Sequence, residues 1–270
     1  MIEADAIDVL LNRISARYGY DFSEYARASL HRRIDLFYTK SKQVSFADMT
    51  KRLLEDTPFF MSFVEQITVN VTEMFRDASF YKMLREHVLP VLATYPFIRI
   101  WHAGCSTGEE VYSLAILLKE ANLLHKSILY ATDINQAVLA QAKTGIFPIS
   151  AMQQNSENYI RSGGLHDFST YYQANYNHAK FDGSLSKKMI FSTHNLVVDA
   201  SFNEFQLILC RNVLIYFNRD LQAKVLQLFD KSLDSLGFLA LGSKESLKFS
   251  PIASYYKQVV YNEKVWRKNR

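Results

Sequence analysis

The chain contains little cysteine, and this limits the sites that it can form. Cys105 and Cys210 are the two cysteines among 270 residues, and neither belongs to a CxxC pair, so a zinc site is not expected. Each stands beside an apolar run that resembles a strand. We therefore expect two buried, reduced thiols in a cytoplasmic protein and no metal site.

Targeting segments and a strong charge are also missing. No apolar run is long enough to span a bilayer, and the acidic start, Met1 to Asp5, does not resemble a signal peptide. The formal net charge is +4, which is mild and does not demand a nucleic-acid partner. We expect no nucleic-acid partner and no direct membrane insertion, so that any work at a membrane is done through another protein.

Hydrophobic residues are plentiful, at 49% of the chain, which allows one large domain or two modest ones. The first 70 residues show only helical patterns, beginning with Leu10, Leu11, Ile14 and Tyr18. Ser23 is predicted to be the N-cap of a second helix, and further helical stretches follow at 46–54 and 59–64. The pattern predicts a small all-helical N-terminal domain, with its linker, over residues 1–75.

The pattern changes at about residue 97, where short apolar runs begin to alternate with helical stretches. The predicted helices are 109–120, 135–143 and 221–236, and the predicted strands are 97–101, 128–131, 189–192, 205–210 and 237–242. This alternation predicts an α/β domain over residues 76–270 with a mainly parallel sheet covered by helices. The last two runs, 258–261 and 264–266, leave no room for a helix and predict a closing antiparallel hairpin. A parallel sheet that ends in such a hairpin resembles the class I methyltransferase fold.

Residues 150–188 interrupt the alternation and are rich in Asn, Ser, Gly and Tyr. Asp182-Gly183 is a common hairpin turn. We interpret the segment as a small inserted antiparallel β appendage, although a decorated loop is nearly as good an interpretation. The aromatic residues expected on its strands are Tyr171, Tyr172, Tyr176 and Phe181.

Two features indicate a ligand site at the carboxyl ends of the strands. A glycine turn, 104–108, joins the first strand to a helix that begins with Glu109 and Glu110. Two acids there would repel a phosphate but suit a ligand that carries an amine and a sulfonium. Asp133 ends the second strand, where an acid can accept both hydroxyls of a ribose or can simply cap a helix.

Several motifs together resemble those of the chemotaxis receptor methyltransferases, the protein-glutamate O-methyltransferase family called CheR. They are Thr68–Asp77, Gly104–Glu110, Asn195–Leu196, Cys210–Phe217 and Leu241–Leu247. The chain departs from the family pattern at Val111, where proline is usual, and at Met74, where phenylalanine is usual. Neither change alters the local shape or polarity enough to put activity in doubt.

The resemblance implies S-adenosylmethionine as the cofactor and S-adenosylhomocysteine as the product. It implies cofactor contacts at ten positions, which are Asn70, Thr72, Arg76, Gly104, Glu110, Asp133, Asn195, Leu196, Arg211 and Asn212. Tyr216 matches a tyrosine near the transferred methyl, and catalytic importance is expected of Arg76 and Tyr216. The competing interpretations are that Arg76 only pairs with Asp77 or Glu73 on a helix, which ranks below the site role, and that Tyr216 is a core aromatic, which is nearly as good an interpretation without the resemblance.

The resemblance also implies the acceptor, which is a glutamate-rich cytoplasmic helix of a methyl-accepting chemotaxis receptor. A basic helix with Arg27, Arg32 and Arg33 could dock this helix, with His31, Lys40 and Lys42 nearby, or could be an ordinary solvated face. The β appendage is a second docking candidate. Because a glutamate is ionised at neutral pH, the reaction needs no general base. The alternatives are a methyltransferase with another acceptor and a non-catalytic cofactor-binding scaffold.

Overall fold

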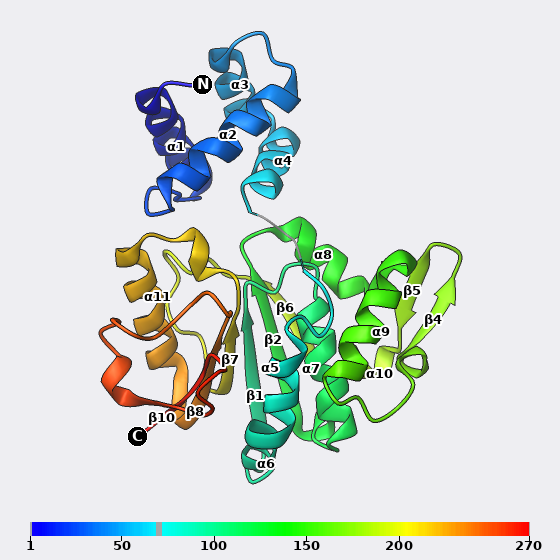
Figure 1. Ribbon diagram of the computed structural model, residues 1–270. Helices are drawn as coiled ribbons and strands as arrows, with labels where there is room; N and C mark the ends of the chain where they lie inside the picture. Colours follow the sequence, from blue (N-terminus) through cyan, green and yellow to red (C-terminus); the bar gives the residue numbers. More distant parts are fainter. Residues whose placement is uncertain (1, 69–71, 270) are drawn as a thin grey trace. The chain divides into compact units, whose positions relative to one another are not determined.

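The structure is a computed structural model that describes residues 2–68 and 72–269 (Figure 1). Its chain divides into two compact units. One unit consists of residues 1–70 together with 214–225, and the other consists of residues 71–213 and 226–270. The predicted domain boundaries, 1–75 and 76–270, stay predictions.

Four helices of the first unit enclose an apolar core. They are α1 (Ala4–Tyr18), α2 (Arg27–Ser41), α3 (Phe46–Glu55) and α4 (Thr57–Ile67). Leu10, Ile34 and Phe63 are fully buried in that core. The Tyr18 and Phe60 rings stack there, with centroids 3.9 Å apart. The prediction of an all-helical segment is therefore confirmed.

The predicted N-cap of the second helix is wrong. Helix α2 begins at Arg27 after Ala26, and Ser23 lies in the preceding turn. In that turn the Ser23 amide donates to the Asp21 carboxylate at 2.8 Å. The Asp21 side chain therefore closes a local turn where the sequence pattern placed the helix start. The short segment 214–217, which includes η5 (Leu214–Tyr216), pairs with this turn through a bridge between Tyr25 and Phe217.

The second unit is built on a seven-stranded sheet with the order β6-β2-β1-β7-β8-β10-β9. The first five strands are parallel, and β10 is antiparallel to both of its neighbours. The strands are β1 (Ile98–Ala103), β2 (Ser127–Asp133), β6 (Met189–Thr193), β7 (Phe205–Cys210), β8 (Leu233–Leu241), β9 (Tyr256–Gln258) and β10 (Val265–Lys268). The predicted parallel sheet and closing hairpin are confirmed, although β9 starts and ends earlier than predicted.

Helices cover both faces of this sheet (Figure 1). Ile98 and Ile100 of β1 pack into the apolar cluster of α5 and α7, whereas the Trp101 ring meets Phe229 of α11 on the opposite face. This is the alternation that a strand buried on both faces requires. The helices are α5 (Ala78–Met83), η1 (Leu84–Val88), α6 (Leu89–Leu92), α7 (Glu109–Glu120), η2 (Leu124–Lys126), α8 (Gln136–Thr144), α11 (Arg219–Ser232) and η6 (Ala253–Tyr255).

The fifth parallel strand begins earlier than the sequence pattern indicates. Strand β8 starts at Leu233, where a longer helix was predicted. Leu233 pairs with Phe205 and Phe238 with Leu207, so the residues between them form a bulge. Leu236 takes a positive φ of 64° in this bulge. The bulge interrupts the alternation of buried positions, which is why the first part of the strand escapes the pattern.

The β appendage is confirmed, with a different turn from the one predicted. Its strands are β3 (Ile146–Pro148), β4 (Tyr172–Asn175) and β5 (His178–Phe181) in the order β3-β5-β4. The β4–β5 turn lies at Tyr176 and not at Asp182-Gly183. Asp182 instead caps a short helix through a bond from the Ser184 amide at 2.6 Å, because aspartate caps helices as readily as it forms turns. The helices of this region are η3 (Ile149–Ala151), α9 (Met152–Arg161), η4 (Phe168–Tyr171) and α10 (Gly183–Ser186).

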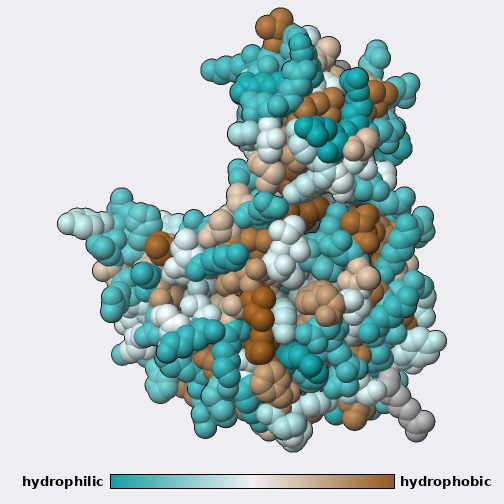
Figure 2. All heavy atoms as spheres, turned by 180° about the vertical axis from the view of Figure 1, so that it is seen from behind, coloured by the Kyte–Doolittle hydropathy of each residue, from teal (hydrophilic) through white to brown (hydrophobic). Residues whose placement is uncertain are grey.

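The face shown in Figure 2 carries mostly hydrophilic residues, with apolar ones among them. Within residues 2–68 and 72–269 no helix combines the length and the apolar character that crossing a membrane requires. Cys105 and Cys210 are free and buried, as the sequence predicts.

Candidate active site

The candidate cofactor residues of the second unit follow the ends of adjacent parallel strands. Gly104 follows β1, Asp133 ends β2, Asn195 comes shortly after β6, and Arg211 follows β7. Because these strands are parallel neighbours, their carboxyl ends share one edge of the sheet. That edge is where open α/β sheets bind ligands.

The glycine turn crosses tightly from β1 to α7. The amides of Gly104 and Cys105 both donate to the Thr132 carbonyl, at 2.8 and 2.9 Å. Gly104 has a φ of 81°, and a Cβ atom at this position would lie 2.4 Å from Val213 Cγ2. Glycine is therefore required twice here, once for the backbone conformation and once for the close approach.

Asp133 presents a buried carboxylate beside this turn. Its two oxygens accept from the Asn135 amide at 3.0 Å and from the Ser106 amide at 2.9 Å. Burial raises the pKa of Asp133, and the backbone hydrogen bonds only partly oppose that shift. A carboxylate has about four acceptor positions, so acceptor capacity remains for a ligand.

Two buried polar atoms of residues close to Asp133 in the fold fit a nucleoside ligand. Ser106 Oγ and Asn135 Nδ2 are buried and have no hydrogen-bond partner among the described residues. Buried polar groups in proteins are nearly always paired. A ligand with hydroxyl groups can complete this set, so the residues present fit the ribose of S-adenosylmethionine.

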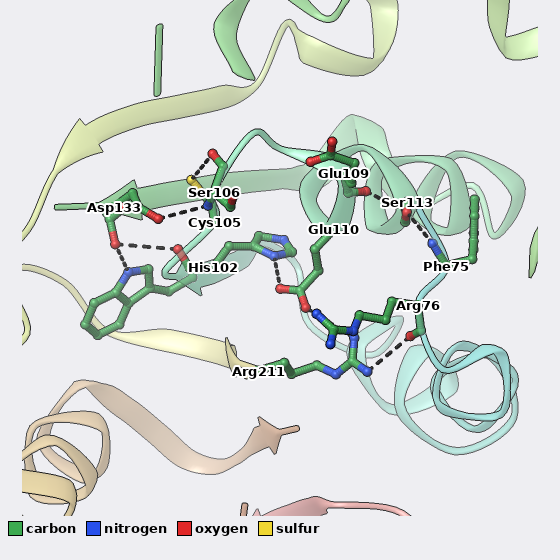
Figure 3. Close-up of polar contacts among 12 residues, drawn as sticks. Phe75, Arg76, His102, Cys105, Ser106, Glu109, Glu110, Ser113, Asp133 and Arg211 are labelled. Carbon is green, nitrogen blue, oxygen red and sulfur yellow. Dashed lines mark hydrogen bonds and ion pairs between the residues drawn. The ribbon is translucent and has the colours of Figure 1, made fainter. Parts of the chain in front are cut away.

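A buried ionic network connects α7 to the strand ends (Figure 3). Glu110 accepts from His102 Nδ1 at 2.9 Å and lies 3.4 Å from Arg211 Nη1. Burial alone would raise the pKa of Glu110, but the His102 hydrogen bond and the Arg211 charge outweigh it and hold the pKa below its ordinary value. Glu110 is therefore an ionised group at neutral pH. In contrast, burial raises the pKa of the neighbouring Glu109.

Arg211 also holds the segment that precedes α5. Its Nη2 donates to the Arg76 carbonyl at 3.1 Å and forms an ion pair with Asp77 at 2.7 Å. The guanidinium lies 4.0 Å from the centroid of the Phe80 ring, and the Arg211 side chain is only 3% exposed. The ion pair of Asp77 is thus made by Arg211, and Arg76 extends toward Glu110 in Figure 3.

Residues 72–77 are positioned by α9 as well as by Arg211. The Met74 amide donates to Asn155, and Asn158 donates to the Met74 carbonyl, both at 3.1 Å. The Phe75 amide donates to Ser113 of α7 at 3.0 Å. This bracing places half-buried Thr72 and Arg76 in a fixed turn, whereas Asn70 lies outside the described residues.

The remaining candidate cofactor residues follow strands β6 and β7. Asn195 forms a local turn in which its amide donates to Asp199 at 2.7 Å and its side chain accepts from Val197 at 3.0 Å. Leu196 is half-buried in this turn. Asn212 has a φ of 62°, and its amide donates to Glu245 at 3.0 Å.

Tyr216 and the basic residues of α2 belong to the helical unit. The Arg33 guanidinium lies 4.6 Å from the centroid of the Tyr216 ring and donates to the Ile67 carbonyl. Arg27 is paired with Asp8 at 3.4 Å, and Arg32 is exposed. Arg33 is therefore engaged in packing, whereas Arg27 and Arg32 are both exposed.

Sequence reasoning missed several residues that shape the site. His102 was not among the predicted site residues, yet it is fully buried and pairs with Glu110. Asn155 and Asn158 were not considered, although asparagines three residues apart share one face of a helix. The signal available in the sequence was the position of His102 directly after the predicted apolar strand 97–101. The two asparagines gave no such signal, because α9 itself was not predicted.

The strand order, with an antiparallel strand inserted between the last two, is that of a class I methyltransferase. The family model "CheR methyltransferase, SAM binding domain" matches residues 70–261, and "CheR methyltransferase, all-alpha domain" matches residues 5–68. The chain belongs to the CheR methyltransferase family. It is a methyltransferase enzyme, and its cofactor is S-adenosylmethionine.

Curated relatives agree with this assignment over most of the chain. A Pseudomonas putida protein named "Putative methyltransferase Cher3" is 45% identical over 263 residues, which cover 97% of this chain and 96% of that protein. A "Chemotaxis protein methyltransferase" of Listeria innocua is 33% identical over 232 residues, or 85% of each chain. One of the same name from Vibrio anguillarum is 32% identical over 224 residues, covering 80% of this chain.

Proposed function

We propose that this enzyme transfers a methyl group to glutamate side chains of a chemotaxis receptor. The observation that carries the proposal is the family match of two parts, an all-α domain followed by a cofactor-binding domain, with relatives named chemotaxis protein methyltransferases. The proposed partner is a cytoplasmic helix of the receptor, so that the enzyme itself works outside the membrane.

The proposed reaction is an in-line displacement at the methyl group that S-adenosylmethionine supplies. A substrate carboxylate oxygen would form the new C–O bond while the C–S bond breaks. The electron pair of the C–S bond would remain on sulfur. The products are a neutral ester and the neutral thioether S-adenosylhomocysteine. A substrate glutamate has an ordinary pKa of about 4.3, so it enters ionised and no proton has to be removed.

Asp133 would orient the cofactor by accepting its ribose hydroxyls. Glu110, held ionised by His102 and Arg211, places negative charge where a ligand with an amine and a sulfonium needs it. The Arg211 charge is already balanced by Asp77 and Glu110, which makes Arg211 a positioning residue. Arg76 is the cation that we assign to the incoming carboxylate. Catalysis would then rest on positioning and desolvation of oppositely charged reactants.

Methyl esters offer a direct test because they hydrolyse in base and release methanol. Purified enzyme would be incubated with methyl-labelled cofactor and receptor-bearing membranes, and the released volatile label would be counted. We expect base-labile label on the receptor, and none with Asp133→Ala. Label that resists base would indicate a different acceptor group. Absence of label with intact S-adenosylhomocysteine binding would favour a non-catalytic scaffold.

Arg76→Ala separates two roles for that residue. If Arg76 orients the carboxylate, the variant lowers kcat/KM for the receptor by about 100-fold, as expected for the loss of a positioned charge, with S-adenosylhomocysteine affinity unchanged. Calorimetric titration and the transfer assay give the two quantities. A parallel loss of cofactor affinity would contradict the carboxylate role and assign Arg76 to the cofactor pocket.

A further inference from the structure

A cavity lies apart from the candidate cofactor residues, within the sheet-containing unit. It has a volume of about 230 Å³. It is formed by residues that follow β8, by the loop between β9 and β10, and by the adjoining ends of these two strands. The lining residues are Ser246, Lys248, Gln258, Tyr261, Asn262, Lys264 and Trp266.

The sheet topology places this cavity at the same edge as the cofactor residues. Strand β8 is parallel to β7, so the loop after Leu241 leaves at the carboxyl edge. Strand β10 runs antiparallel with Val265 opposite Ala240, so the loop that ends at Lys264 lies at this edge too. The loops that line the cavity therefore leave the sheet at the edge where the candidate cofactor residues lie.

A buried acid joins the first loop to the candidate site. The Glu245 carboxylate accepts from the Gly242 amide at 2.6 Å and from the Asn212 amide at 3.0 Å. Asn212 follows Arg211 directly. The segment with Ser246 and Lys248 is thus anchored one residue away from the buried ionic network.

The second loop is braced before any partner arrives. The Gln258 side chain donates to the Tyr261 carbonyl at 2.9 Å and to the Glu263 carbonyl at 2.8 Å. These two bonds close the loop into a turn. A partner therefore meets a wall that is already shaped, which lowers the entropic cost of binding.

The charge of this region is strongly positive. Residues 242–270 contain seven Lys and Arg and two Asp and Glu, whereas residues 1–241 contain 24 and 25. The net positive charge of the chain therefore resides in its last segment. Lys248 and Lys264 line the cavity, and neither forms an ion pair with another described residue. Of the two acids, Glu245 is buried and engaged in hydrogen bonds.

Exposed aromatic residues stand beside the lysines. Phe249 is fully exposed, and Tyr261 is 88% exposed. Lysine ammonium groups recognise carboxylates, and exposed rings add apolar contact with a helix surface. The combination fits an acidic, amphipathic protein segment.

We propose that this cavity, which we call the Lys248–Lys264 pocket, binds an acidic side chain of the acceptor protein close to the glutamate that is methylated. The inference rests on the proposed function and adds a docking residue pair to it. The pocket would hold the acceptor segment in register by one carboxylate while another carboxylate enters the cofactor site. Half-exposed ion pairs of this kind contribute modest affinity but accelerate association at low salt.

The test compares two charge-reversal variants with the same change in net charge. One is Lys248→Glu with Lys264→Glu. The matched control is Lys143→Glu with Lys231→Glu, which are exposed lysines in the last turns of α8 and α11. A fluorescently labelled glutamate-rich helical peptide is titrated with each protein in the presence of S-adenosylhomocysteine, and cofactor affinity is measured separately by calorimetry.

We expect the pocket variant to bind the peptide about five- to tenfold more weakly than the control variant at low salt, with the difference fading at high salt. Cofactor affinity should be equal in both. Equal peptide affinity of the two variants, or no binding by the unaltered protein, would overturn the pocket. If the peptide result holds but receptor membranes accept no methyl group, the proposed function fails and the docking site for an acidic segment stands.

Discussion

Asp133 combines burial with a need for charge. An ionised carboxylate accepts ribose hydroxyls better than a protonated one, yet burial raises the pKa of Asp133 above the ordinary 3.8. As the pH falls, Asp133 should become protonated at a higher pH than an ordinary aspartate does. The affinity for S-adenosylhomocysteine should therefore begin to fall at that higher pH. Calorimetric titration over a pH series measures this loss.

Asp133→Asn should remove that pH dependence and weaken binding by about 10- to 100-fold at neutral pH, since a hydrogen bond to a charged group contributes about 1.5–3 kcal/mol. The exposed Asp167→Asn provides the matched control and should bind normally. A pH profile of Asp133→Asn that follows the unaltered protein would assign the titration to another group.

Glu110 shows the opposite shift. Its folded-state pKa lies below the ordinary value of 4.5, so its contribution to stability is present above pH 4.5 and is lost as the pH falls through the folded pKa. Glu110→Gln removes a partner of two buried groups and should lower the free energy of unfolding by about 3 kcal/mol at pH 7. The loss should shrink below pH 4.5.

Urea unfolding at pH 7 and at pH 4 measures both quantities for Glu110→Gln. Glu157→Gln changes an exposed acid of α9 and serves as the control. An equal loss at both pH values would mean that side-chain shape, and not charge, accounts for the effect.

At the scale of elements, the turn after β1 depends on one glycine. Gly104→Ala meets both a positive φ and the Val213 side chain, so we expect a loss of about 2–4 kcal/mol in unfolding free energy. Gly183→Ala is the matched control, because a Cβ atom there meets nothing within 4 Å. Thermal unfolding distinguishes the two, and an equal melting temperature would contradict the steric account.

The end of α7 anchors the appendage through one carboxylate. Glu120 pairs with Arg85 at 2.5 Å and accepts from the hydroxyls of Tyr159 and Tyr171, and its side chain is 1% exposed. Glu120→Gln should therefore destabilise the protein by about 3 kcal/mol. Tyr171→Phe loses a single bond and should cost about 1 kcal/mol.

Tyr172→Phe serves as a control for Tyr171→Phe, because it removes the hydroxyl of the adjacent, half-buried tyrosine. Chemical unfolding gives the three values. Cofactor affinity should stay unchanged in all of them, and its loss in Glu120→Gln would show that the anchor also shapes the site.

The sequence predicted most elements of the sheet because a parallel strand buried on both faces forms a continuous apolar run. Helix 109–120 was predicted with its observed bounds, since glycine precedes it and the apolar period is clear. The sequence did not predict the local structure where one side chain can form either of two kinds of hydrogen bond. Asp182 could form a turn or cap a helix, and Asp21 closed a turn where Ser23 looked like a cap.

The candidate site was predictable from its motifs as a set of residues, but not as a network. That Arg211 pairs with Asp77 and Glu110 depends on strand ends that meet only after the sheet has formed. The same holds for Glu245, whose buried carboxylate links two loops that lie far apart in the sequence. The assignment of individual residues to cofactor and catalysis stays a prediction.

At the scale of the whole molecule, the helical unit includes a distant segment. The Ala26 amide donates to Tyr216 at 2.8 Å, and the Asn218 amide donates to Glu24 at 2.9 Å. A chain truncated to residues 72–270 loses these partners. We expect amide exchange at residues 214–218 to become at least about tenfold faster, because each lost bond is worth about 1 kcal/mol or more.

Hydrogen exchange of the truncated and full chains, followed at single amides, measures this change. Amides of α7 should exchange at the same rate in both and serve as the internal reference. Unchanged protection at residues 214–218 would mean that this segment holds its conformation without the helices.

The division of the helical unit also sets an order during protein synthesis. The ribosome completes the four helices early but must add residues 71–213 before it reaches the segment that finishes their unit. At about 5–20 residues per second, residues 71–225 take roughly 8 to 30 seconds to emerge. Throughout that interval the turn around Tyr25 lacks Phe217, so the first unit to be translated cannot finish folding until most of the sheet has been made.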